Sequence, residues 1–266
     1  GTGVAVMSVR MADLTWPELD ALTKAGPPIV FLPSGALEQH GPHLPLGTAT
    51  TLPTLLAERV AARLGGLVAP ALSYGYKSQP KSGGGNHMPG CAALDGSTYI
   101  HMVRDLICDF ARHGLTKIVL FDGHMENQMF LTEASDLALR ALKAEGIDNV
   151  RIVKLGYWIS IDAELEAELF PEGLISWELE HAAVMETSVM LHLQPDHVRA
   201  DLIPDHPPAD FPLYDGYPFD PDSVSHSGAL TSAAGASAAK GKAVVDKLVP
   251  ALAAQIAEAF DMPAPA

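Results

Sequence analysis

The sequence predicts an α/β fold in which helices cover both faces of a mostly parallel sheet, a three-layer αβα sandwich. Short apolar runs alternate with longer segments of helical periodicity along the chain. The run at 28–33 is continuously apolar, which is typical of a strand that is buried on both faces. In such sheets, ligands bind beyond the carboxyl ends of the strands. Candidate site residues are therefore sought directly after each expected strand.

The expected elements follow one another with short connections, and neither a linker nor an internal repeat divides the chain. We therefore expect a single domain over 1–266. Ser97 or Thr98 is expected to cap the helix that follows the longest loop, and Pro250 to break or kink the last helix. Strands are expected at 28–33, 67–72, 117–121 and 150–155, helices at 14–23, 50–64, 98–113, 126–144, 181–193 and about 231–260, a long loop at 73–96, and an irregular surface excursion at 203–223.

Composition narrows the class of protein. The formal net charge of -15 disfavours nucleic acid and anionic membranes as partners. A hydrophobic content of 48% with 18% charged residues fits a soluble globular protein. No run approaches the roughly 18–20 apolar residues of a membrane span.

The ends and the cysteines of the chain point to a cytoplasmic protein. The first ten residues lack the apolar core of a signal peptide. Met7 could be the natural start, with residues 1–7 a vector-derived or disordered addition. Cys91 and Cys108 do not make a disulfide framework and fit no zinc motif, so we expect free thiols in a reduced compartment.

Two short segments after expected strands carry mirrored pairs of potential metal ligands. Glu38 and His40, with His43 close behind, follow the strand at 28–33, and His124 and Glu126 follow the strand at 117–121. In extended backbone, residues i and i+2 point the same way, so each pair can aim a carboxylate and an imidazole at one point. This mixed nitrogen and oxygen set suits one or two ions of zinc or manganese. A single histidine is more often structural, but the mirrored arrangement favours a site.

A third cluster, Glu180-His181 with Glu186 nearby, offers groups for proton transfer. On its own this signal is weak, because adjacent Glu and His are common by chance. Trp158 and Trp177 could wall a flat substrate, although core packing is the commoner role of tryptophan. The glycines at 83–85 could let backbone approach a ligand closely, with a disordered surface loop as the alternative.

Three segments together resemble the creatininase (creatinine amidohydrolase) family: LPSGALEQHGPHLPLGT at 32–48, DGHMEN at 122–127 and EHAAVMETS at 180–188. The segments YGYKSQPKSGGGNHMPG, GYW and PEGLISWELEH extend the resemblance, which covers nearly the whole chain from Leu14 to about Pro221. The resemblance implies an αβα fold, two divalent metal ions, a homohexamer, and reversible hydrolysis of a small cyclic amide, creatinine to creatine. A metal-bound water is then the expected nucleophile.

Carried over by position, the resemblance assigns a role to each candidate. Glu38 and His124 are expected to hold one metal, and His40 and Glu126 the other. Glu180 and His181 are expected to transfer protons to the ring nitrogen, with Glu186 supporting them. The expected substrate-binding residues are Ser82 and the glycines after it, Gly123, Met125, Trp158 and Trp177.

The chain departs from the family pattern at two positions that matter. Ala49 stands where the family has an aspartate that bridges both metals, so the centre lacks its bridge and this chain is expected to be slow or inactive. An engineered inactive variant and a natural protein with altered metal binding both explain this, and the first is favoured because every other ligand is intact. Met125 replaces a tyrosine, which leaves another cyclic amide or a formamide open as the substrate. Asp122 stands where asparagine is common. A non-catalytic ligand-binding oligomer is the alternative outside the enzyme class.

Overall fold

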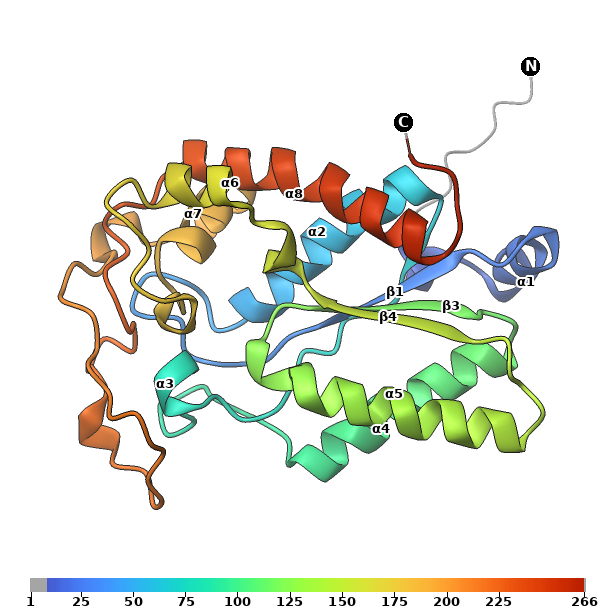
Figure 1. Ribbon diagram of the computed structural model, residues 1–266, viewed down its shortest axis with the longest axis horizontal. Helices are drawn as coiled ribbons and strands as arrows, with labels where there is room; N and C mark the ends of the chain where they lie inside the picture. Colours follow the sequence, from blue (N-terminus) through green and yellow to red (C-terminus); the bar gives the residue numbers. More distant parts are fainter. Residues whose placement is uncertain (1–8, 266) are drawn as a thin grey trace.

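Four parallel strands form the centre of the structure, a computed structural model that describes residues 9–265 (Figure 1). Their order across the sheet is β2-β1-β3-β4. Strands β1 and β3 pair along their full length, from Ile29 opposite Lys117 to Ser34 opposite Asp122. The ends of the two strands are therefore level, and the segments that follow them leave the sheet side by side. The strands are β1 Ile29–Ser34, β2 Leu67–Val68, β3 Lys117–Asp122 and β4 Arg151–Gly156.

Helices cover both faces of this sheet, which confirms the three-layer αβα prediction. Figure 1 shows α2, α6, α7 and α8 on one face, and α4 and α5 on the other. Helix α3 lies in the long loop, close to the end of the sheet where the strands finish (Figure 1). The helices are α1 Trp16–Ala25, α2 Thr48–Leu64, α3 Pro80–Gly83, α4 Gly96–Arg112, α5 Gln128–Ala144, α6 Ala163–Leu169, α7 Val184–Leu193 and α8 Ala238–Ala259.

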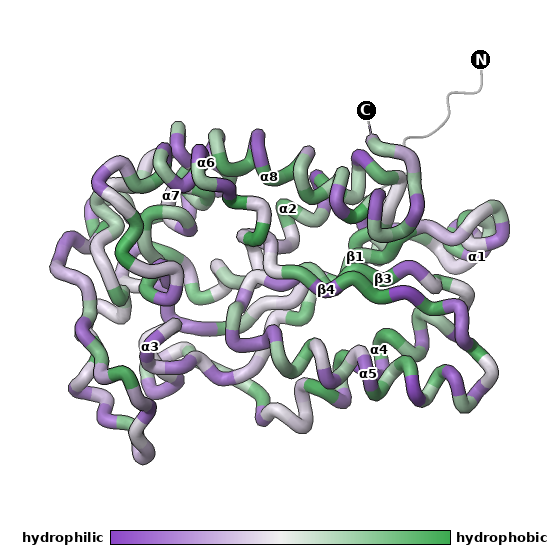
Figure 2. Tube along the Cα trace, viewed as in Figure 1, coloured by the Kyte–Doolittle hydropathy of each residue, from purple (hydrophilic) through white to green (hydrophobic). Residues whose placement is uncertain are grey.

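Alternation along β1 explains why its sequence is continuously apolar. Ile29 and Phe31 pack into the hydrophobic cluster shared with α2, α7 and α8, whereas Val30 and Leu32 pack into the cluster shared with α4 and α5. Successive side chains of a strand point to opposite faces, so a sheet covered on both sides needs apolar residues at every position. Figure 2 shows hydrophobic residues gathered where β1 and β3 cross the molecule.

Several expected boundaries are wrong, each for a local reason. The strand expected at 67–72 is regular only at Leu67–Val68. The helix expected from 98 begins at Gly96 after Asp95, so neither Ser97 nor Thr98 is its N-cap. The helix expected from 181 begins at Val184, because Ala182 has a φ of 53° and cannot continue a right-handed helix.

The last helix starts later than expected and is not broken by its proline. Residues 231–237 are not helical, and Ser237 caps the first turn by accepting a hydrogen bond from the Lys240 backbone N–H. Pro250 lies inside α8, flanked by the buried side chains of Val249 and Leu252. Packing against α7 and α2 therefore outweighs the roughly 3 kcal/mol that an interior proline costs.

Two remaining expectations concern the surface and the ends. The excursion at 203–223 is irregular apart from a short 3-10 turn at Pro221–Ser223, as predicted. The proposed start at Met7 lies outside the described residues. Between residues 9 and 265, no helix is long and apolar enough to cross a membrane.

The contact between α7 and α8 depends on Gly241, which gives a first prediction. A Cβ at Gly241 would lie 1.9 Å from the Ser188 carbonyl oxygen. We expect Gly241→Ala to lower the free energy of unfolding by about 1–3 kcal/mol through overpacking, measured by urea denaturation. At an ordinary helix position alanine is instead favoured over glycine by about 1 kcal/mol. The reverse exchange Ala254→Gly, at an exposed position of the same helix, serves as the control. Unchanged stability of Gly241→Ala would contradict the proposed contact.

Candidate active site and metal centre

The two ligand-bearing segments meet beyond the carboxyl ends of β1 and β3. The Gly123 backbone N–H donates to the Ser34 carbonyl, at 2.8 Å, which ties the segments together where the strands end. Glu38 from the first segment and His124 from the second come within 3.1 Å, measured from Oε1 to Nδ1. Both side chains are buried. The structure thus brings together residues that are 86 positions apart in the sequence.

Glu38 is the centre of a cluster of three buried imidazoles. Its Oε1 lies 3.7 Å from His40 Nε2 and 3.8 Å from His181 Nδ1, in addition to the 3.1 Å contact with His124 Nδ1. Burial acts to raise the pKa of the Glu38 carboxyl, but the facing imidazoles outweigh it and hold that pKa well below its usual range. The carboxylate is therefore ionised.

Backbone carbonyls fix the tautomer of all three histidines. A carbonyl oxygen only accepts hydrogen bonds, so each ring nitrogen beside one carries the hydrogen. The other ring nitrogen of each histidine faces Glu38, and a divalent ion bound there would displace any hydrogen that this nitrogen carries. This is how metal-ligating histidines are held in proteins. The donor–acceptor pairs are His124 Nε2 to Tyr76 O at 2.8 Å, His40 Nδ1 to Glu38 O at 3.2 Å, and His181 Nε2 to Gln39 O at 2.7 Å.

The cluster fits a divalent cation. Among the described residues, Glu38 Oε2 and His40 Nε2 are buried without a hydrogen-bond partner. Buried polar atoms without partners are costly, and a bound cation would satisfy both of these atoms. One ligand atom each from Glu38, His40 and His181 lie within 4.8 Å of one another. Imidazole and carboxylate donors in this combination suit zinc or manganese.

Glu126 occupies the far side of the cluster, next to His124. Its Oε2 lies 3.3 Å from His124 Nδ1. Its Oε1 accepts hydrogen bonds from the Ser82 hydroxyl at 2.6 Å and from the Gln79 backbone N–H at 3.3 Å. Ser82, expected in the substrate pocket, therefore also orients a candidate ligand.

His40 has a different neighbour from the one that the sequence suggested. Its Nε2 lies 3.5 Å from Glu186 Oε1, whereas Glu126 contacts His124. Burial acts to lower the pKa of His40, but Glu186 and Glu38 outweigh it and raise the pKa to about 9. Glu186 is itself held by the Ala182 backbone N–H at 2.6 Å, in agreement with a supporting role.

His43, the third potential ligand of the first segment, lies outside the cluster. Its Nε2 is 2.8 Å from the Thr187 hydroxyl, and its ring is buried. Burial lowers the pKa of His43 to about 4, so the ring is neutral. His43 is five residues after Glu38 and does not face the cluster. Because the segment is irregular, no strand or helix periodicity could predict the direction of its side chain.

Glu180 is the group in this cluster best suited to carry a proton. Burial raises the pKa of its carboxyl to about 7. One of its oxygens accepts a hydrogen bond from the Met185 backbone N–H at 3.3 Å, in the first turn of α7. A carboxyl that titrates near neutrality beside a cavity is a typical general acid or base.

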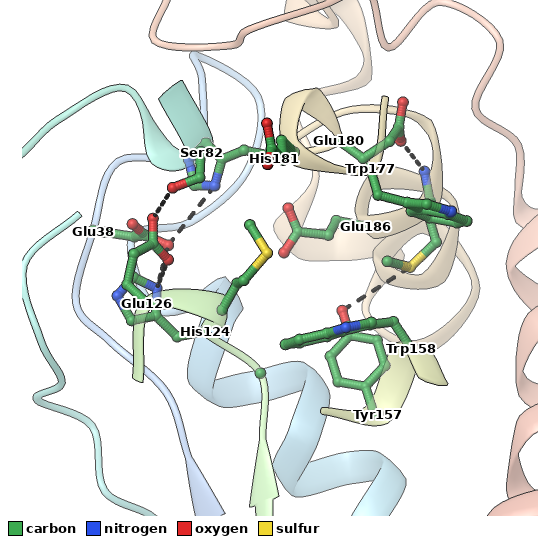
Figure 3. A pocket seen from close by; sticks show the side chains of 14 residues that line it. Glu38, Ser82, His124, Glu126, Tyr157, Trp158, Trp177, Glu180, His181 and Glu186 are labelled. Atoms are coloured by element: carbon green, nitrogen blue, oxygen red, sulfur yellow. Dashed lines mark hydrogen bonds and ion pairs between the residues drawn. The ribbon is translucent and has the colours of Figure 1, made fainter. Parts of the chain in front are cut away.

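A cavity of about 80 Å³ opens beside the cluster. Figure 3 shows Glu38, His124 and Glu126 on one side of it, Trp158 and Trp177 on the other, and Glu186 between them. The Trp177 indole N–H donates to Glu166 at 3.2 Å, which fixes its ring. Of the expected substrate-binding residues, Ser82, Gly123, Met125, Trp158 and Trp177 line the cavity, whereas the glycines after Ser82 do not.

Ala49 is buried at the start of α2, close to both ligand segments. A Cβ at Gly35 or Gly123 would come within 2.5 Å of the Ala49 carbonyl oxygen. Both glycines precede ligands, so the backbone of residue 49 lies against the two segments that form the centre. Alanine offers no side-chain atom that can bind a metal.

Sequence reasoning missed several residues that shape the site. Gln39 donates through its amide to the Gly83 and Gly228 carbonyls, each at 2.8 Å, and joins three segments around the cavity. Its place between Glu38 and His40 was the available signal. Backbone carbonyls such as that of Tyr76 leave no signal in a sequence. Tyr157, Glu178 and Met185 also line the cavity and were not proposed.

Comparison with known proteins gives the family. The creatininase family, described as creatinine amidohydrolase, matches residues 12–256. The chain belongs to the creatininase family. It is 48% identical to the creatinine amidohydrolase of Pseudomonas putida, over 95% of this chain and 98% of that protein.

Solved creatininase structures share the fold closely. A manganese form is 48% identical and a mutant of Zn–Zn type 47% identical, each with a TM-score of 0.94 over 96% of this chain and 99% of theirs. A mutant creatininase complexed with creatine is 47% identical, with a TM-score of 0.93 over the same shares of the two chains.

The position of Glu38 gives a prediction for this creatininase-family site. We expect Glu38→Gln to weaken Zn²⁺ binding by about 100-fold or more, because it removes the charge that all three imidazoles face. Competition with a chromophoric chelator measures the affinity, and circular dichroism checks the fold. Glu178→Gln is the matched control, because Glu178 is exposed at the cavity and has no contact with these imidazoles. Equal affinities of the two variants would rule out Glu38 as the centre of the metal site.

Proposed function

We propose that this protein is a metal-dependent cyclic amidohydrolase that interconverts creatinine and creatine. The observation that carries the proposal is the buried Glu38–imidazole cluster beside a cavity walled by two tryptophans. The 48% identity to a creatinine amidohydrolase supports creatinine as the substrate. In the forward reaction, the water oxygen bonds to the ring carbonyl carbon, the carbon–nitrogen bond breaks, and the leaving nitrogen takes a proton.

The residues around the cavity have different roles in this reaction. Glu38, His40, His124 and Glu126 would hold divalent zinc or manganese. When bound, such an ion activates water and polarises a carbonyl. Trp158 and Trp177 hold a flat ring between them and keep bulk water out of the cavity. Ser82 and Gly123 border the ring, and the Ser82 hydroxyl keeps Glu126 in place.

Glu180 delivers the proton to the leaving nitrogen. Its pKa near 7 lets a substantial fraction of the carboxyl carry a proton at neutral pH. The Met185 backbone N–H anchors one oxygen, and the carboxyl borders the cavity. His181, next in the chain, is the second member of the pair expected from the family pattern.

Ala49 limits how much metal and activity this chain has. Without a carboxylate at position 49, we expect two ions to lose their shared ligand and the second to bind weakly. We also propose that the chain forms a single domain, assembles as a homohexamer and works in the cytoplasm, as expected from its sequence.

Restoring the carboxylate tests the proposed function. We expect Ala49→Asp to raise the metal content toward two ions per chain and the rate of creatine formation by about 100-fold or more, because the aspartate can bind both ions. Mass spectrometry measures metal and product. If the restored protein hydrolyses another cyclic amide but not creatinine, the substrate is wrong. If it hydrolyses no cyclic amide but binds ligands tightly, the result supports the alternative of a non-catalytic ligand-binding oligomer.

The raised pKa of Glu180 gives a pH prediction for the Ala49→Asp protein. As the proton donor, Glu180 must be protonated, so kcat/KM should fall as pH rises through about 7. Glu180→Gln should lose this limb and lower kcat by about 10²–10⁴-fold. The Glu178→Gln protein should keep the fall of kcat/KM with rising pH, because the carboxyl that this variant replaces is exposed to solvent. If kcat/KM of Glu180→Gln still falls as pH rises through about 7, another group is the proton donor.

A further inference from the structure

The two ring nitrogens of His181 have different surroundings. Nε2 lies 2.7 Å from the Gln39 carbonyl oxygen and therefore carries the hydrogen. Nδ1 is then the ring nitrogen that can bind an ion, and it lies 3.8 Å from Glu38 Oε1 within a buried side chain. A proton donor needs its N–H directed at the substrate, whereas a metal ligand needs a bare nitrogen directed at the ion. The hydrogen of His181 is engaged by the backbone, which is the arrangement of a ligand.

Glu38, His40 and His181 have the spacing of a ligand set for one ion. Their ligand atoms all lie within 4.8 Å of one another, and the contacts to Glu38 Oε1 measure 3.7 and 3.8 Å. Ligands about 2.0–2.1 Å from a tetrahedral zinc lie about 3.3–3.4 Å apart. Each contact therefore needs to shorten by only a few tenths of an ångström. The rings of His40 and His181, with centroids 4.3 Å apart, already lie against each other.

Unsatisfied atoms are concentrated in this half of the cluster. His40 Nε2 and Glu38 Oε2 are buried without hydrogen-bond partners among the described residues. On the other side, Glu126 has both oxygens engaged, by the Ser82 hydroxyl and by His124. A lone cation between Glu38, His40 and His181 would thus satisfy His40 Nε2, which has no hydrogen-bond partner, whereas both oxygens of Glu126 already have partners.

We propose that His181 is a metal ligand in this chain, and that Glu38 Oε1, His40 Nε2 and His181 Nδ1 together hold a single divalent ion. His181 supplies the third protein ligand that residue 49, an alanine, does not. Three protein ligands leave a fourth position open, as catalytic zinc sites require. The proposal rests on the metal dependence in the proposed function, and it leaves proton transfer to Glu180 alone.

Cobalt binding to the metal-free protein tests this directly, without any turnover. We expect one Co²⁺ per chain, with the strong visible absorption of a four-coordinate site. His181→Ala should weaken Co²⁺ binding by about 100-fold and weaken the visible band. Added imidazole should restore the band, because it can enter the space left by the side chain. Glu180→Gln, the neighbouring residue, should keep both affinity and spectrum.

Position 49 supplies a second, independent comparison. In the Ala49→Asp background the aspartate takes over as a ligand, so His181→Ala should lower Co²⁺ affinity much less than it does with alanine at 49. If His181→Ala leaves affinity and spectrum unchanged with alanine at position 49, His181 is not a ligand. If that variant is unfolded by circular dichroism, His181→Gln replaces it, with the same loss expected and the same contradiction if binding is unchanged.

These outcomes are separable from those of the proposed function. Co²⁺ binding through His181 without creatinine turnover by the Ala49→Asp protein overturns the substrate and leaves the ligand assignment intact. Turnover by the Ala49→Asp protein together with unaltered Co²⁺ binding by His181→Ala overturns the ligand assignment and leaves the function intact.

Discussion

One buried carboxylate organises the site. Glu38 is ionised within the protein, and an isolated buried charge is too costly to persist without compensation. Three imidazoles supply that compensation by converging on its Oε1, within 3.1 to 3.8 Å. Each imidazole is held in turn by a backbone carbonyl, so the cluster cannot relax by rotating a ring. The burial of an ionised Glu38 therefore depends on these imidazoles.

The sheet makes this convergence possible. Because Ser34 and Asp122 pair at the ends of β1 and β3, the two ligand segments begin at the same level. Glycine follows each strand, and a Cβ at Gly35 or Gly123 would collide with the first turn of α2. The close approach of backbone at this point brings the helix start, and with it position 49, against the two ligand segments.

Much of this could be predicted from the sequence, and the failures have physical causes. Continuous apolar runs identified β1 and β3, and the mirrored Glu38 and Glu126 pairs pointed to the correct end of the sheet. Pairing between ligands was harder to predict, because side chains in irregular segments follow neither helical nor strand periodicity. His43, close to Glu38 in sequence, faces Thr187 instead. The last helix continues through Pro250 because tertiary packing outweighs the local preference of proline. Such packing involves residues far apart in the chain, so a short stretch of sequence does not reveal it.

The absence of a carboxylate at position 49 changes the electrostatics as well as the ligand count. Five glutamates, Glu38, Glu126, Glu178, Glu180 and Glu186, already line one cavity. A further carboxylate there would add to the repulsion in the metal-free protein, and bound cations would offset that repulsion. Alanine at position 49 adds no such charge. The carboxyl groups around the cavity therefore repel one another less with alanine at position 49 than they would with aspartate there.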